Sequence, residues 1–359
     1  MQSFGITRIA RITGLDRCGV EVACAIRPGG HILQVSNGKG STFRSAAIGA
    51  LCEAAELWGA EQLNPLALRW GSIDEMSAAT EVWVPDLLPN PWDRRTRFAW
   101  RSARSLADDR EIYVPAHQVH CPPSNGMGLG PDVCAWTSNG MGAHFDRLKA
   151  IQHALLEAIE WDQLARVLPQ GWTATAINRR KMELSPSKLP NAFALREQLS
   201  KSGFEPYLFN LMPTKKTSLG LPVVGALLFG EAGSPLPLTA GYACRLGWDD
   251  AFCAALREAA QSRLTDIHGA REDLVGADLD FQPSVDALRK DCRRKASTPE
   301  MHRARLQPGL KPSTSIALIL KKLKRGGYPR VAVADLAPPG SEIQIVKVLI
   351  PGLLLSELL

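Results

Sequence analysis

The chain has 359 residues, of which 45% are hydrophobic and 22% charged, and its formal net charge is +6. This composition is that of a globular protein with a packed core, and it excludes an intrinsically disordered chain. The length fits one large α/β domain or two fused lobes, 1–170 and 171–359. No stretch reaches the roughly 18 apolar residues that a membrane span needs, and the N-terminus has no apolar signal segment. A cytoplasmic location without membrane contact is therefore expected.

Eight cysteines are scattered without a Cys-x-x-Cys pair, which argues against a disulfide framework and a zinc ribbon. Positive charge is concentrated, because residues 289–330 hold thirteen Lys or Arg against two Asp or Glu. This segment is either a solvated face or a landing surface for an acidic peptide, nucleotide phosphates or a partner protein. Nucleic acid is not expected as the partner, because Tyr328 is the one aromatic residue among these charges.

Hydrophobic patterns predict a mixed α/β (α+β) chain. Three short β-rich runs, 6–12, 20–26 and 31–35, predict an opening meander. A helix is predicted from about Thr42 to Gln62, stopped before Pro65. The remaining elements are a polar connection to a strand at 111–120, a Gly/Pro/Ser-rich loop at 122–131, a helix from an Asp146 N-cap to about Val167, a helix at 191–202, strands at 206–212 and 222–229, a helix at 249–267, a basic helix at 314–325 and strands at 330–336 and 342–350.

A short motif recurs at intervals of about a hundred residues and predicts a repeated unit. Its copies carry Ala-Leu-x-Glu-Ala at Ala50–Ala54, Ala154–Ala158 and Ala255–Ala259. Three residues beyond each glutamate lie Glu56, Glu160 and Gln261. Glycine-containing segments, interpreted as turns, precede the three helices at Ser36–Gly40, Ser138–Gly142 and, less clearly, Thr239–Ala243. A strand, a glycine turn and an acidic helix are thus expected three times, although Ala-Leu-x-Glu-Ala is also common in unrelated helices.

Two carboxylate pairs follow from this motif, because residues three apart share one face of a helix. They are Glu53 with Glu56 and Glu157 with Glu160. On the first helix the pair lies opposite an apolar stripe, as on a solvated face, yet that opposite face carries almost no other charge. If both faces are covered, each unpaired carboxylate costs several kcal/mol and cations must compensate.

Divalent cations with oxygen ligands answer this need, and Mg²⁺ commonly bridges to the phosphates of a nucleotide. A di-iron site is disfavoured because neither helix has Glu-x-x-His. The run Gly38–Thr42 offers backbone N–H groups and the cation of Lys39 just before a helix. It does not satisfy the Walker pattern. Phosphate contact by Lys39 and a tight turn with an exposed lysine both stay open.

Taken in order, these segments resemble the YcaO family over nearly the whole chain. Leu15–Val22 resembles the family's opening Leu-Asp-Arg-x-Gly-x-Pro-Val, with Glu21 in place of proline. The first nucleotide motif is resembled by Gly38–Gly40 followed by Ala50, Leu51, Glu53 and Glu56, and the second by Ser138–Gly140 with Glu157–Glu160 and Asp162. The third is resembled by Gln261–Thr265 and Gly269–Asp273, in the style of the branch that occurs beside TfuA proteins.

The resemblance implies a single YcaO-type domain over residues 1–359 that binds ATP and Mg²⁺ without a Walker loop. The metal ligands it implies are Glu53, Glu56, Glu157 and Glu160. The ATP contacts it implies are Lys39, Glu53, Asn139, Gln261, Arg263 and Arg271. For the two arginines, a surface or structural ion pair is the alternative.

The resemblance also implies a reaction, in which the oxygen of a peptide-backbone amide is phosphorylated and a nucleophile then adds to the carbonyl carbon. A neighbouring Cys, Ser or Thr of the substrate gives an azoline, and external sulfide gives a thioamide, the outcome associated with TfuA partners. Residues 354–359 lack the proline-rich end of azoline-forming members. Thioamidation of a ribosomally made precursor peptide, with a TfuA-like partner, is therefore expected, with the azoline as the alternative. A homodimer stays open.

Four residues depart from the family pattern. Gly49 stands where serine is usual, Leu57 and Trp161 replace arginines, and Lys149 occupies a usual glutamate position. These departures keep a third hypothesis open, namely a degenerate, non-catalytic scaffold.

Overall fold

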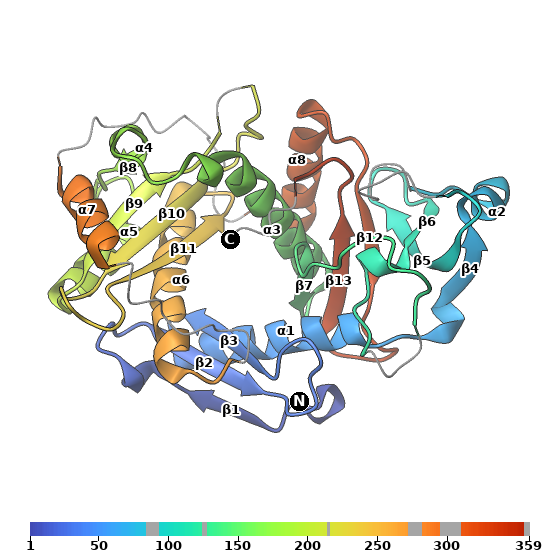
Figure 1. The fold of residues 1–359 in the computed structure, drawn as a ribbon, viewed down its shortest axis with the longest axis horizontal. Helices are drawn as coiled ribbons and strands as arrows, with labels where there is room; N and C mark the ends of the chain where they lie inside the picture. Colours follow the sequence, from blue (N-terminus) through green and yellow to red (C-terminus); the bar gives the residue numbers. More distant parts are fainter. Residues whose placement is uncertain (84–92, 124–127, 214–215, 272–281, 295–309, 355–359) are drawn as a thin grey trace.

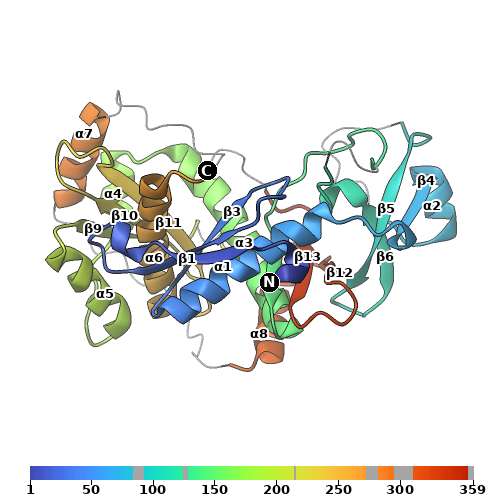
Figure 2. The same cartoon turned by 90° about the horizontal axis from the view of Figure 1, so that it is seen from below.

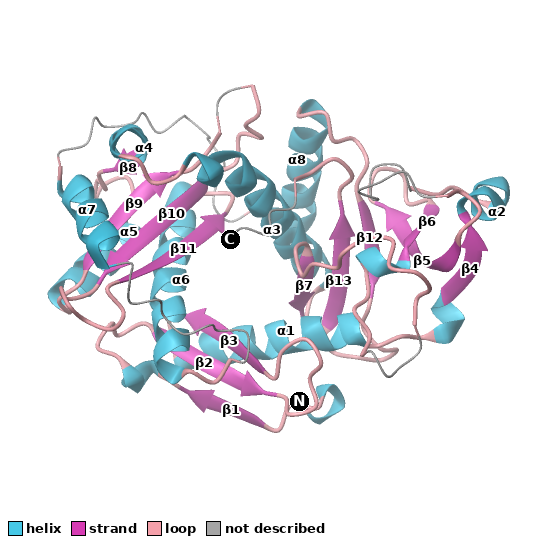
Figure 3. Ribbon diagram, in the orientation of Figure 1, coloured by secondary structure: helices cyan, strands magenta, loops and turns pink. Residues whose placement is uncertain are grey.

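The computed structural model describes residues 1–359 except 84–92, 124–127, 214–215, 272–281, 295–309 and 355–359. Parts of the loop at 122–131, of the third motif, of the basic segment 289–330 and of the chain end therefore lie outside the described residues. Three antiparallel sheets and their helices surround the centre of the view in Figure 1. The mixed α/β class is confirmed (Figure 3). None of the helices in the described ranges is long and apolar enough to cross a membrane.

The first sheet is the predicted meander. Its strands pair in chain order, β1 (Arg8–Arg11), β2 (Glu21–Ile26) and β3 (Val35–Gly40). Helix α1 (Phe43–Glu61) packs on β2 and β3. The third strand was predicted at 31–35 and in fact runs through Ser36–Gly40, so the interpretation of that segment as a glycine turn is wrong.

The second sheet combines strands from residues 68–144 with the last two strands of the chain. Its strand order is β4 (Leu68–Ser72), β5 (Arg97–Ser105), β12 (Ala332–Asp335), β13 (Gln344–Leu349) and β7 (Met141–His144), with β6 (Glu111–Pro115) paired to β5. Helix α2 (Ile73–Ala79) follows β4. The strands β4 and β5 and the helix α2 were missed, because 65–110 was predicted as a polar connection.

The third sheet has the order β11 (Leu238–Cys244), β10 (Val223–Phe229), β9 (Glu205–Asn210) and β8 (Lys181–Met182). Helices α5 (Pro190–Lys201) and α6 (Trp248–His268) pack on it, and α4 (Ala174–Arg180) contacts α7 (Gln282–Arg293). Short 3-10 helices occupy Gln2–Phe4, Thr13–Leu15, Pro65–Ala67, Ala116–Gln118 and Leu168–Gln170.

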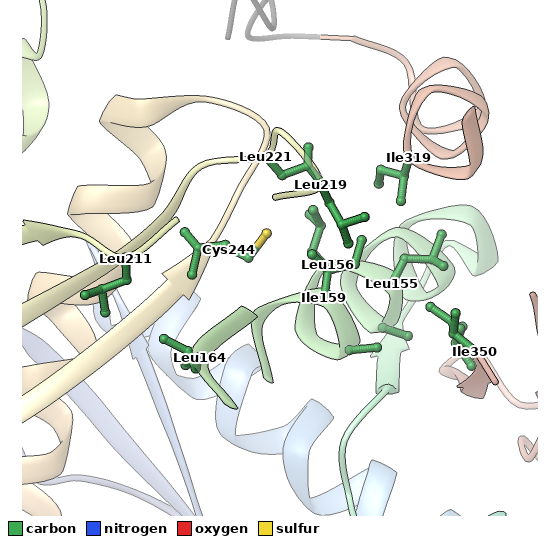
Figure 4. Close-up of a cluster of buried hydrophobic side chains, with 14 of the residues drawn as sticks. Leu155, Leu156, Ile159, Leu164, Leu211, Leu219, Leu221, Cys244, Ile319 and Ile350 are labelled. Carbon is green, nitrogen blue, oxygen red and sulfur yellow. The ribbon is translucent and has the colours of Figure 1, made fainter. Parts of the chain in front are cut away.

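Helix α3 (Arg147–Val167) lies in the middle of the largest hydrophobic cluster. Its Leu155 and Ile159 gather with Leu219 and with Ile319 of α8 (Pro312–Arg325), as Figure 4 shows. The predicted N-caps are confirmed, since Thr42 accepts from the backbone N–H of Ser45 and Asp146 caps α3. Both helices are apolar on more than one side because neighbouring sheets cover them.

Helix α1 shows this covering most clearly. Its buried residues are spread around the helix and include Ala46, Ala50, Cys52, Ala54, Ala55, Leu57, Gly59 and Ala60. Phe43, the first residue of the helix, is 41% exposed. The alternative in which both faces of α1 are covered is therefore confirmed. The helix runs from the first sheet towards β7 and β13 in both views (Figures 1 and 2).

Three strand-helix units, β3–α1, β7–α3 and β11–α6, form the repeated part of the fold, and each strand lies at one end of its sheet's strand order. A glycine in each strand lies directly against its helix. A Cβ atom added there would come within 2.4 Å of helix backbone: Gly38 to Ala46 O and Ala50 N, Gly142 to Ala150 O, and Gly241 to Ala255 O and Ala259 N. These glycines therefore serve close packing of strand on helix.

The same contacts set the register of the repeat. They align the carbonyls of Ala46, Ala150 and Ala255. On α6 the Ala-Leu-x-Glu-Ala motif therefore lies one helical turn closer to the N-terminus of the helix than on α1 and α3. The expected match of Glu258 with Glu53 and Glu157 is wrong, because Glu258 occupies the position of Gly49 and His153. Ser262 takes the position of Glu53 and Glu157. Thr265 takes the position of Glu56 and Glu160.

Candidate functional site

The three units are linked in a ring, because each helix also contacts the strand of the next unit: α1 contacts β7, α3 contacts β11 and α6 contacts β3. A side-chain hydrogen bond joins each of these neighbours: Ala143 N donates to Glu56 Oε1 (2.7 Å), Cys244 N to Glu160 Oε2 (2.6 Å), and Asn37 Nδ2 to Thr265 Oγ1 (2.7 Å). In two of these three hydrogen bonds a glutamate accepts a backbone N–H, whereas the bond at the third junction joins two neutral side chains.

The four predicted metal ligands are brought together by this ring. Burial raises the pKa of Glu53 to about 7, that of Glu56 to about 8 and that of Glu160 to about 7. Burial also raises the pKa of Glu157 well above its ordinary value, and the charges of Glu56 and Glu160 raise it further. Solvent still reaches part of each of the four residues, so the carboxylates lie at a recessed surface.

Glu157 has the least satisfied carboxylate of the four. Its Oε2 atom is buried and has no hydrogen-bond partner. Its charge and that of Glu56, which comes from a different helix, act on each other, so the two pairs form one cluster. A buried acceptor without a donor costs about 1–3 kcal/mol, more when it is charged. The cluster is therefore short of positive charge.

Lys347 on β13 is a cation that the sequence analysis missed. Its side chain is 3% exposed, and Nζ donates to Thr137 O at 2.5 Å and Asn139 O at 2.7 Å. Burial lowers the pKa of Lys347 to about 8, while the charges of Glu157 and Glu56 act in the opposite direction. A lysine inside the apolar run Ile343–Ile350 was the signal that could have revealed it.

Helix α6, the helix of the third unit, contributes Glu258, a second residue that the sequence analysis did not assign to the site. Lys39 Nζ lies 2.9 Å from Glu258 Oε2. The backbone N–H of Tyr242 donates to Glu258 Oε1 at 3.3 Å. The charge of Glu258 raises the pKa of both Glu53 and Glu160, after burial. Glu258 therefore faces carboxylates of α1 and α3.

The other predicted ATP contacts divide into two groups. Asn139 lines a cavity of about 90 Å³ together with Lys347, and the positive charge of Arg271 acts on Glu53. Arg263 is instead 2.7 Å from Asp16 and donates to Leu236 O at 2.6 Å. Arg263 thus has the contacts of the ion-pair alternative, and it anchors the opening motif.

Gln261 is placed by its backbone, whose carbonyl accepts from Thr265 Oγ1. Among the residues that depart from the family pattern, Leu57 is 5% exposed, whereas Lys149 is exposed. A Cβ on Gly49 would meet Gly38 Cα at 3.4 Å, an ordinary contact, so the backbone there has room for a Cβ atom.

The donor set fits Mg²⁺ with a nucleotide better than a metal held by protein alone. Within the described ranges, no group of three His, Cys, Asp or Glu side chains is arranged so that it could hold a metal ion by itself. Mg²⁺ commonly takes one or two carboxylates and completes its octahedron with water and substrate phosphates. Paired glutamates with one unpartnered buried oxygen supply ligands of this kind.

A family model described as "YcaO cyclodehydratase, ATP-ad Mg2+-binding" matches residues 37–354. An uncharacterized protein of Methanothermobacter thermautotrophicus is 30% identical and covers 98% of this chain and 91% of its own length. An uncharacterized protein in the tfuA 3' region of Rhizobium leguminosarum bv. trifolii is 26% identical, over 98% of this chain and 84% of its own.

Two solved structures share the fold. A heterocyclase in complex with substrate and cofactor has a TM-score of 0.73 at 18% identity, over 97% of this chain. This chain spans 50% of the heterocyclase. YcaO from Methanopyrus kandleri bound with AMPPCP and Mg²⁺ has a TM-score of 0.71 at 19% identity, over 98% of this chain and 87% of its own. The family match over most of the chain identifies ATP and Mg²⁺ as its cofactors, and the chain belongs to the YcaO family.

Proposed function

We propose that this chain is an ATP-dependent enzyme that activates a backbone amide of a ribosomally synthesised peptide by O-phosphorylation. The product we propose is a thioamide, formed with a TfuA-like partner that delivers sulfide. The observation that carries the proposal is the cluster of four glutamates from two helices, in which Glu157 Oε2 is buried without a partner.

In this proposal Glu53, Glu56, Glu157 and Glu160 hold Mg²⁺, while Lys39, Asn139 and Arg271 lie towards the nucleotide. The metal would neutralise phosphate charge during phosphoryl transfer. Lys347 holds the backbone carbonyls of Thr137 and Asn139, and so keeps the segment before β7 against the glutamates. Arg263 keeps the opening motif in place through Asp16.

The thioamide is favoured by the relative in a tfuA 3' region. An azoline is the second candidate, because the family description names a cyclodehydratase and one fold neighbour is a heterocyclase. Mass spectrometry of the modified peptide separates them. Exchange of oxygen for sulfur raises the peptide mass, whereas ring formation removes water and lowers it.

Calorimetric titration with ATP and Mg²⁺ tests the shared part of the proposal. The wild type should bind, and Glu157→Gln/Glu160→Gln should lose binding by roughly 100-fold or more, because metal ligands are removed. The unfolding free energy of this double variant without ligand should hold or rise, since repulsion between the carboxylates is relieved. Glu197→Gln/Glu231→Gln is the matched control, because these carboxylates are 40% and 68% exposed.

A wild type that gives a flat titration would contradict the enzyme proposal. That result would favour the scaffold hypothesis, which rests on Leu57, Lys149 and Trp161. Binding that is unchanged in the double variant would instead remove the assignment of these glutamates while leaving nucleotide binding in place.

A further inference from the structure

A buried lysine holds the turn that precedes β7. Nζ of Lys347 donates to the carbonyls of Thr137 and Asn139 at 2.5 Å and 2.7 Å, and the residue is 3% exposed. We infer that Lys347 is a positioning residue that acts as a tethered monovalent cation, at a place that chemically suits K⁺ or NH₄⁺. The inference rests on the proposed function and deepens it, because Asn139 lies towards the nucleotide in that proposal.

Two neighbouring residues of β13 fix the turn in different ways. The backbone N–H of Val348 donates to Gly140 O at 2.8 Å. Gly140 has a φ of 81°, and a Cβ atom there would lie 2.7 Å from Val348 O, so the two chains are in close contact. The backbone of β13 therefore holds the turn at Gly140, whereas the ammonium of Lys347 holds it at Thr137 and Asn139.

The ammonium has the surroundings that a monovalent cation needs. Its hydrogen bonds go to neutral backbone carbonyls, which are also the ligands of K⁺ in selectivity filters. The charges of Glu157 and Glu56 favour the charged form of Lys347, against the effect of burial on its pKa. The cation is thus held by two carbonyls and stabilised by the charge of two carboxylates.

A cavity of about 90 Å³ adjoins the ammonium, and Lys347, Thr137 and Asn139 are among the residues that line it. Roughly 10–15 Å³ of such a volume admits one water molecule, so the cavity has room for a small ion. If an apolar side chain replaced Lys347, the two carbonyls would lose their donor beside this cavity. Because a buried acceptor without a donor is costly, an ion from solution is expected to take the place of the ammonium.

A cation that is fixed to the chain makes the order of the turn independent of dissolved ions. A free ion loses translational freedom when it binds, whereas the ammonium of a buried side chain is already confined. We therefore expect the wild type to bind ATP with Mg²⁺ equally well with and without K⁺. A variant without the ammonium should instead depend on a small monovalent cation.

The test replaces Lys347 by methionine, which keeps an apolar stem and removes the charge. Urea denaturation without nucleotide compares NH₄Cl with tetramethylammonium chloride at equal concentration, because the tetramethylammonium ion has the same charge but no N–H to donate. NH₄Cl should raise the urea midpoint of Lys347→Met relative to tetramethylammonium chloride, and it should leave that of the wild type unchanged.

Calorimetric titration with ATP and Mg²⁺ in the same two salts gives a second readout. In tetramethylammonium chloride, Lys347→Met should bind ATP about tenfold more weakly than the wild type, the scale of a hydrogen bond to a charged group. NH₄Cl should restore most of this affinity. A lysine that contributed only packing would give a loss that ammonium does not restore.

Lys181→Met is the matched control, because Lys181 is 5% exposed and its Nζ also donates to backbone carbonyls, those of Cys292 and Arg294. Lys181 belongs to β8 in the third sheet. Its replacement should leave the affinity for ATP unchanged in both salts.

An equal response of Lys347→Met to the two salts, in urea midpoint and in ATP affinity, would overturn the inference. If Lys347→Met does not fold, the wild type decides: an ATP affinity that KCl leaves unchanged supports the inference, and one that KCl raises overturns it. A flat ATP titration of the wild type would overturn the proposed function, while the effect of ammonium on the urea midpoint of Lys347→Met would still decide whether Lys347 acts as a tethered cation.

Discussion

Helix α1 buries two glutamates in different ways. Glu61, 5% exposed, accepts two hydrogen bonds from the guanidinium of Arg27, the longer at 2.7 Å, and backbone N–H groups of His31 and Ile32 at 2.8 Å. Glu56 accepts one N–H, from Ala143, and has no ion-pair partner among the described residues. Burial and the charge of Glu53 raise the pKa of Glu56 to about 8. A carboxylate with all its partners is structural, whereas one without a cation marks a place for a ligand.

Helix α3 repeats the comparison. Asp162 is fully buried and accepts from the side chains of Arg166 and Gln163 and from the backbone N–H of Leu354. Glu157, about one turn earlier, leaves a buried oxygen without a donor. On both helices the C-terminal acid thus anchors neighbouring chain, and the earlier acids face the candidate site.

Breaking the satisfied pair should have the largest effect on stability. Arg27→Met leaves Glu61 buried with no cation, and it should lower the free energy of unfolding by about 3–5 kcal/mol, the usual cost of breaking a buried ion pair. Urea denaturation at neutral pH measures it. Arg27→Met/Glu61→Met, which removes both charges, should recover much of the loss. A single variant within about 1 kcal/mol of the wild type would contradict the structural role.

The unsatisfied acid should make stability depend on pH in a specific direction. Between pH 4.5 and about 8, Glu56 is protonated in the folded chain and ionised in the unfolded chain. The free energy of unfolding without ligand should therefore fall as the pH rises through this range, by at most about 1.4 kcal/mol per pH unit for this group. Glu56→Gln should flatten the slope in urea denaturation across this range.

Glu231→Gln is the control for that measurement, because its carboxylate is 68% exposed and should not alter the slope. An identical slope in Glu56→Gln and in the wild type would show that Glu56 is ionised in the folded chain at low pH, and would end the contrast with Glu61.

The smallest effect is expected at Lys149, whose side chain is exposed on the first turn of α3. Lys149→Ala and Lys149→Glu should each change the free energy of ATP binding by less than about 0.5 kcal/mol in calorimetry. A loss of about 1–3 kcal/mol in Lys149→Ala would instead indicate a phosphate contact. ATPase activity gained only in Lys149→Glu would identify a degenerate enzyme and would contradict the proposed function.

Local spacing predicted what depends on neighbours along the chain. The caps at Thr42 and Asp146, the opening meander and the shared face of each glutamate pair all follow from the periods of helix and strand. The glycine segments Ser36–Gly40 and Thr239–Ala243 were misinterpreted as turns, whereas a turn does precede β7, where Met141 N donates to Ser138 O at 2.9 Å. A glycine for a turn and a glycine for close packing look alike until the helix that packs on the strand is known. At Gly38, only the contact with Ala46 and Ala50 separates the two.

The sequence by itself determined the family, the fold class and the two acidic helices, because ordered motifs and residues three apart on a helix need no tertiary information. Only the tertiary structure decided which groups meet. It brought Lys347 from the last strand to Glu56 and Glu157, and it paired Arg263 with Asp16. It also placed Glu258 of α6 in an ion pair with Lys39. The physical reason is that helical periodicity fixes directions within one element, whereas contacts between elements depend on strand order and on the closing of three units into a ring.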